Sequence, residues 1–77
     1  MKQFVEFIIK QLVDKPGKVK VDQDKPDEKT IALTVEVDKD DIGKIIGKKG
    51  KNINAIRTLV TALGAKDDKR TTLQVVE

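Results

Sequence analysis

Two glycines that bracket two lysines, Gly47-Lys48-Lys49-Gly50, interrupt a helical pattern of apolar residues in the second half of the chain. The apolar pair Ile45-Ile46 leads into Gly47 without a polar turn residue, and Asp40-Asp41 stands where an N-cap and an acidic first turn belong. Glycine lacks a Cβ, so the backbone can turn sharply here and approach another chain closely. The amides of Lys49, Gly50 and Lys51 are expected to open a second helix, whose N-terminus attracts anions. The segment therefore predicts a phosphate-contacting loop between two short helices.

The first part of the chain predicts one helix and a β-hairpin. Residues 2–14 place apolar side chains at helical spacing, and Pro16 and Gly17 then stop the helix. Residues 18–22 and 30–37 alternate polar and apolar side chains, which is the period of a half-buried strand. The polar segment 24–29 between them predicts the turn of an antiparallel hairpin.

Beyond the loop, the sequence predicts a helix and a final strand. The helix is expected to run to about residue 63, with Gly64 as its C-terminal stop. Its expected buried side holds Ile53, Ile56, Leu59, Val60 and Leu63. Residues 71–76 read as the last strand, which gives the order αββααβ in a single domain over residues 1–77. A chain of this length buries only about 60% of its unfolded surface, so the core is small.

The composition argues against catalysis and against bound metal. The chain has no cysteine and no histidine, which removes disulfides, thiolate ligands and the commonest general base. The carboxylates between Asp22 and Asp41 lack calcium-loop spacing, although a metal site built from them is the alternative. We therefore expect no enzyme activity, no metal and no cofactor. The longest apolar run, residues 7–9, is far too short for a bilayer, so we expect a cytoplasmic protein without membrane insertion.

The charges are segregated along the chain, although the net charge is only +3. Residues 22–41 hold eight acidic residues and three lysines. Residues 42–57 hold no acid and five basic residues, which are Lys44, Lys48, Lys49, Lys51 and Arg57. This distribution favours a local cationic site. A solvated helix face rich in lysine is the alternative explanation of the same pattern.

Other glycine motifs fit these residues poorly. A P-loop needs four residues between its glycines and a serine or threonine after its lysine, whereas Gly43 and Gly47 enclose three and Lys49 follows Lys48. A dinucleotide-binding motif needs glycine at position 45, which is Ile45. A plain corner between two helices, in which the glycines only relieve crowding, remains open.

The run from Ile45 to Ile53 resembles the signature of the KH domain, which holds about four nucleotides of single-stranded nucleic acid at its GxxG loop. The order αββααβ matches type II KH domains. Residues 4–16, 43–50 and 55–60 extend the resemblance over nearly the whole chain, to the KhpA family of small stand-alone bacterial KH proteins. The implied fold is α+β, with a three-stranded mixed sheet packed against three helices.

The resemblance also implies roles for individual residues. The loop residues Lys48 and Lys49 would vary within the family between two fixed glycines, and Gly43 would keep the first helix thin beside the nucleic acid. Ile46 and Ile53 would anchor the loop in the core and form the apolar floor of the groove. Lys44 and Lys51 would flank the path of the nucleic-acid backbone. Arg57 is either an RNA ligand or a solvated or ion-paired side chain. The predicted RNA-binding residues are Gly43, Lys44, Ile46, Gly47, Lys48, Lys49, Gly50, Lys51, Ile53 and Arg57.

By the same resemblance, the chain is expected to bind single-stranded RNA as an RNA chaperone or post-transcriptional regulator. The resemblance further implies a homodimer, a complex with a larger KhpB-like KH-domain protein, and a link to cell shape. No aromatic residue follows Phe7, so bases cannot stack on such side chains, and recognition depends on backbone contacts and groove shape. A dimerising adaptor module and single-stranded DNA binding remain the alternative functions.

Phe7 is the residue that the sequence itself offers for a dimer contact. It lies outside the apolar stripe of the first helix, on the Phe4 side, and widens that stripe beyond the usual core-facing arc. An uncovered phenylalanine in so small a domain is a candidate contact. The alternative is that Phe7 folds over the edge of the sheet.

Overall fold

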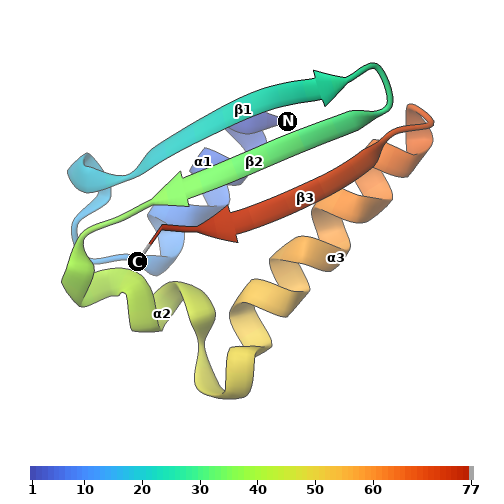
Figure 1. The fold of residues 1–77 in the computed structure, drawn as a ribbon. Helices are drawn as coiled ribbons and strands as arrows, with labels where there is room; N and C mark the ends of the chain where they lie inside the picture. Colours follow the sequence, from blue (N-terminus) through green and yellow to red (C-terminus); the bar gives the residue numbers. More distant parts are fainter. Residues whose placement is uncertain (77) are drawn as a thin grey trace.

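The computed structural model describes residues 1–76 and has the predicted order of helices and strands. The helices are α1 (Lys2–Leu12), α2 (Ile42–Ile46) and α3 (Lys51–Lys66). The strands are β1 (Lys20–Asp27), β2 (Thr30–Glu36) and β3 (Arg70–Val75). Short 3-10 turns, η1 (Pro16–Lys18), η2 (Lys39–Asp41) and η3 (Lys48–Gly50), lie between them. Figure 1 shows that the connection between α2 and α3 projects away from the sheet.

The sheet is mixed, with β2 in the centre. β1 pairs with β2 in the antiparallel direction, with Val21 opposite Val35. β3 pairs with β2 in the parallel direction, with Leu73 opposite Leu33. This sheet and the three helices form the predicted α+β fold of a type II KH domain.

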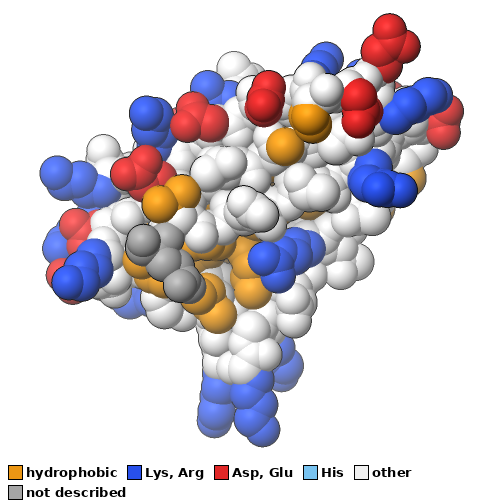
Figure 2. All heavy atoms as spheres, viewed as in Figure 1, with side chains coloured by type: hydrophobic (Ala, Val, Ile, Leu, Met, Phe, Trp, Pro, Cys, Tyr) orange, Lys and Arg blue, Asp and Glu red, His pale blue; other side chains and the backbone are white. Residues whose placement is uncertain are grey.

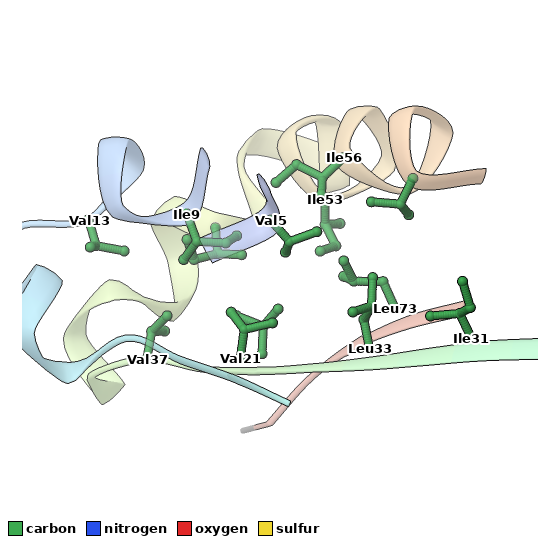
Figure 3. Close-up of a cluster of buried hydrophobic side chains, with 13 residues drawn as sticks. Val5, Ile9, Val13, Val21, Ile31, Leu33, Val37, Ile53, Ile56 and Leu73 are labelled. Atoms are coloured by element: carbon green, nitrogen blue, oxygen red, sulfur yellow. The ribbon is translucent and has the colours of Figure 1, made fainter. Parts of the chain in front are cut away.

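The core lies between the sheet and the helices, as Figure 3 shows. Because side chains alternate along a strand, β2 directs Ile31, Leu33 and Val35 toward the helices and leaves the intervening residues on the other face. Burying one such aliphatic side chain stabilises the fold by roughly 1.5–3 kcal/mol. The helices supply Val5 and Ile9 from α1, Ile45 from α2, and Ile53, Ile56 and Val60 from α3.

The hairpin differs from the prediction at both ends of β1. The expected turn over residues 24–29 is wrong, because β1 continues to Asp27 and only Glu28 and Lys29 form the turn. The Asp27 carboxylate accepts the amide of Lys29 at 2.8 Å and so holds the tight turn. Pro26 is tolerated because β1 is an edge strand and its register shifts between Asp24 and Asp27. The expected strand start at residue 18 is also wrong, since η1 ends there.

The prediction that Gly64 stops the last helix is wrong. α3 continues to Lys66, and Gly64 is buried inside it. A Cβ at this position would collide with the Thr71 hydroxyl of β3, so the glycine lets the helix lie close to the strand. Leu59 also differs from the prediction, because it is 47% exposed and lies outside the core. Within residues 1–76, no helix has the length and apolar character needed to cross a membrane.

Candidate nucleic-acid interface

The loop between α2 and α3 is built from backbone conformations that favour glycine. Gly47 has φ 76°, Lys49 has φ 57° and Gly50 has φ 75°, so three of four successive residues lie in the left-handed region. Lys49 carries a Cβ there, which costs roughly 1–2 kcal/mol. A Cβ on Gly47 would also lie 2.7 Å from Cγ of Asn52. Gly47 is therefore required by both conformation and space, and Gly50 by conformation.

The loop carries three exposed lysines, Lys48, Lys49 and Lys51, which we call the loop lysines. They line a shallow hollow of about 280 Å³ at the tip of the molecule. Figure 2 shows this group of cationic side chains at the projecting end, without acidic side chains beside it. The six ion pairs among residues 1–76 involve none of the loop lysines. Their charges are thus available to an anion from outside.

An apolar surface lies between the loop lysines and the sheet. Ile46 is half-buried at the end of α2, directly before Gly47, and packs against the core. Ile53, one turn into α3, is only 5% exposed and anchors the loop from below. Figure 2 shows hydrophobic side chains exposed between the tip and the strands. Ile46 is thus partly accessible beside the loop, whereas Ile53 belongs to the core.

Comparison with known proteins assigns the family. The family model described as the KH domain of KhpA and KhpB matches residues 2–75. The chain belongs to the KhpA/KhpB family of KH domains. This membership confirms the resemblance seen in the sequence, and it confirms the prediction that the chain is not an enzyme.

Curated relatives of the KhpA/KhpB family match over the full length of the chain. The RNA-binding protein KhpA of Chlamydia pneumoniae is 43% identical over 77 residues, which are 100% of this chain and 97% of that protein. The protein of the same name from Listeria monocytogenes is 42% identical and covers 100% of both chains. The one from Aquifex aeolicus is 42% identical over 100% of this chain and 96% of its own. No solved structure matches the chain.

Arg57 lies at the free edge of the sheet in this KhpA/KhpB-family domain. Its Nε donates a hydrogen bond to the Leu73 carbonyl at 3.2 Å. The amides of Arg70 and Val76 donate to the carbonyls of Lys29 and Val35, on the β2 side of β3. Because successive residues of a strand direct their backbone groups to opposite sides, the carbonyl of Leu73 faces the open edge of β3. The other guanidinium N–H groups keep their donor capacity. α3 also carries no acidic residue, so nothing on this helix repels a phosphate chain.

Two further predicted residues of the KhpA/KhpB motif lie on α2. Lys44 forms ion pairs with Asp14 and with Asp41, the latter at 3.8 Å. The hydrogen bond to Asp14 raises the pKa of the Lys44 ammonium, so Lys44 stays charged but is already paired. A Cβ on Gly43 would meet no atom within 4 Å, so the protein's own packing does not require glycine there. The place of Gly43 beside a ligand stays a prediction.

Asp41 has a role that the sequence analysis missed. Asp41 occupies the N-cap position of α2, but its side chain accepts no backbone amide of the first turn. Asp41 is instead 1% exposed and accepts the amides of Asp14 at 3.3 Å and Lys15 at 3.1 Å. The local cap of η2 is Asp38, which accepts the amide of Asp40 at 2.9 Å. The buried carboxylate thus joins the chain after α1 to the start of α2, and no local signal marks this bond.

Proposed function

We propose that the chain binds single-stranded RNA and that the loop Gly47–Gly50 holds the RNA backbone. The observation that carries this proposal is the group of loop lysines on a projecting loop, which form no ion pair within residues 1–76 and lie directly beside the half-buried Ile46. The names of the curated relatives, which are called RNA-binding proteins, support the same function.

Binding proceeds through charge and shape. The loop lysines attract the phosphates, and the start of α3 adds the positive end of its dipole. Ile46 offers an apolar surface to the bases, while Gly43 leaves room beside it. Arg57 bounds the same surface at the edge of β3. Because no aromatic side chain is present there for stacking, we expect loose sequence preference.

Oligonucleotide titrations test this function. Fluorescence anisotropy with matched single-stranded RNA and DNA of eight nucleotides is expected to give tighter binding to RNA. The salt dependence should be shallow, because single strands release only about 0.7 counterions per neutralised phosphate and the clamp covers about four nucleotides. Tighter binding to DNA would identify a DNA-binding protein, and no binding to either would leave the adaptor function.

The adaptor function is the second candidate, because apolar side chains are exposed away from the loop. Phe7 is 65% exposed, so it does not fold over the sheet edge, and Phe4 and Leu59 are also exposed. Phe4 and Leu63 line a hollow of about 400 Å³ between α1 and α3. We propose that this surface mediates a homodimer, as the sequence suggested for Phe7. A dimer in sedimentation that Phe7→Ser weakens would support it, and a monomer at every concentration would exclude it.

We also propose that the chain acts as an RNA chaperone or post-transcriptional regulator in the cytoplasm. It would do so together with a KhpB-like partner. The matching family model covers the KH domains of both KhpA and KhpB, so such a partner would carry a domain related to this chain. Crosslinking the protein to RNA in cells and sequencing the bound RNA would identify targets. Recovery of protein partners without RNA would contradict the regulatory role.

A further inference from the structure

The base of the loop is closed by Asn52, a residue in the first turn of α3 that the sequence motif leaves without a role. Its Nδ2 donates a hydrogen bond to the carbonyl of Lys44 in α2 at 2.8 Å. The last carbonyls of a helix have no partner inside that helix. The asparagine side chain therefore satisfies one of them and joins the two helices that the loop separates.

Gly47 lies directly against the same side chain. A Cβ on Gly47 would lie 2.7 Å from Cγ and 2.9 Å from Cβ of Asn52, which is closer than real atoms approach. Asn52 thus borders the chain at two places near the end of α2. Its side chain bonds to the carbonyl of Lys44, and Gly47, directly after the helix, lies against it. The backbone nitrogen of Asn52 would also lie 2.8 Å from that Cβ, so both the side chain and the backbone of Asn52 border the point where the loop leaves α2.

The hydrogen bonds within the loop, among the described residues, involve only the backbone. The amide of Gly47 bonds to the carbonyl of Gly43 at 2.9 Å, and the amide of Gly50 bonds to the carbonyl of Gly47 at 3.2 Å. α2 has five residues, which is far below the length at which an isolated helix is stable in water. The left-handed residues of the loop also add strain. A side-chain tie at the base therefore has a large influence on how the loop lysines are presented.

We propose that Asn52 is a positioning residue for RNA binding, which acts through Gly47 and α2 and does not itself hold the phosphate. The proposal rests on the proposed function of the loop. Asn52 and its hydrogen bond are at the surface, so water replaces the lost partner when the side chain is removed. Removing Asn52 thus changes the geometry of the loop while the core and the number of lysines stay the same.

Two substitutions at Asn52 and one control test the proposal. Asn52→Ala removes the side chain, and Asn52→Leu keeps a similar volume without the donor. Asn54→Ala is the matched control, because Asn54 is in the same turn of α3 and its side chain makes no hydrogen bond within residues 1–76. We expect both Asn52 variants to lose about two- to tenfold in RNA affinity, which corresponds to one hydrogen bond. Asn54→Ala should bind as the wild type does.

A salt series separates positioning from direct contact. Lys48→Ala removes a phosphate contact, so its slope of log affinity against log salt should be shallower than that of the wild type. The Asn52 variants keep every cation, so their slope should equal the wild-type slope. A reduced slope in Asn52→Ala would overturn the proposal, because Asn52 would then contact the phosphate itself. Wild-type affinity in both Asn52 variants would overturn it as well.

Amide hydrogen exchange of the free protein tests the same tie without RNA. Faster exchange of the Gly47 and Gly50 amides in Asn52→Ala, with unchanged exchange in the core strand β2, is the expected result. Unchanged exchange at both glycines would overturn the proposal whatever the RNA affinity. Failure of the wild-type protein to bind RNA would instead overturn the proposed function, and the exchange rates would still decide whether Asn52 holds the loop.

Discussion

Lysines gather at both ends of α2, and the two groups differ in what surrounds them. Before the helix, Lys15 contacts Asp38 at 3.3 Å and Asp40 at 3.2 Å, and from the helix Lys44 contacts Asp14 and Asp41. We call Lys15 and Lys44 the paired lysines. After the helix, the loop lysines have no carboxylate within 4.0 Å in the part of the chain that the structure describes.

The comparison teaches that the number of basic residues in a segment overstates the charge offered to a ligand. The segment 42–57 contains no acid, yet the fold brings acidic residues from before it to Lys44. The paired lysines hold the chain after α1 against the start of α2. The loop lysines make no such contact within residues 1–76. The same residue type therefore supports the fold at one end of a short helix and presents charge at the other.

The largest expected effect comes from reversing the charge of the loop lysines. Lys48→Asp with Lys49→Asp should abolish RNA binding, with a loss of about a hundredfold or more, because two attractive contacts become repulsive. Both side chains are exposed, so circular dichroism should show an intact fold. A gel-shift titration measures the affinity. The control reverses two lysines outside the loop, Lys2→Asp at the start of α1 with Lys25→Asp in β1, and equal losses in both double variants would exclude the loop from the mechanism.

The next effect is on the free energy of unfolding at the other end of α2. Asp41→Ala should lower it by about 2–4 kcal/mol, because two backbone amides lose a charged acceptor in a buried place. Urea unfolding followed by circular dichroism gives the value. Asp38→Ala at the surface should cost much less, and an equal cost at both positions would show that burial of the Asp41 bonds is unimportant.

A pair of matched substitutions compares the two groups directly. Lys51→Gln should weaken RNA binding by about two- to fivefold, since one unpaired cation is lost near the phosphates. Lys44→Gln should cause a smaller loss, because its charge is already neutralised by Asp14 and Asp41. Anisotropy titrations at low salt give both affinities. A larger loss at Lys44 would mean that RNA displaces the carboxylates and recruits the paired lysine.

The smallest effect is a pH dependence of stability. The amide of Asp40, together with Lys15, holds the pKa of the Asp38 carboxyl below its usual value. A carboxyl whose pKa is lower in the folded state than in the unfolded state stabilises the fold at pH values above its unfolded pKa. This stabilisation is lost as the pH falls toward and through the folded pKa. The melting temperature should therefore fall more steeply below about pH 4 in the wild type than in Asp38→Asn. Identical acid profiles would show that the pairing contributes nothing to folding.

The elements that could be predicted depend on neighbours in sequence. The alternation through Ile31, Leu33 and Val35 marks β2 because side chains of a strand alternate between faces. Gly47 and Gly50 mark the loop because their conformations exclude most other residues. The order of elements and the place of the loop follow from such local rules.

The features that could not be predicted depend on residues far apart in the chain. Asp41 reads as a helix cap, but its partners lie 26 and 27 residues earlier. Gly64 reads as a helix end, but it fits under Thr71 of the neighbouring strand. Lys44 reads as a free cation because Asp14 is distant in sequence. Each of these roles is decided by tertiary packing, which overrides the local signal.

The parallel pairing of β2 with β3 determines when the binding surface is completed during synthesis. β3 comes after every other element in the chain, yet it pairs with the central strand, with Arg70 opposite Thr30. A nascent chain that lacks β3 already has the hairpin and α1, against which α2 and the start of α3 pack, but it lacks the strand that covers the rest of α3. The loop lies inside this crossover, so we expect the final strand to complete the fold around it. We therefore expect the loop to reach its native stability only after the last strand has been translated.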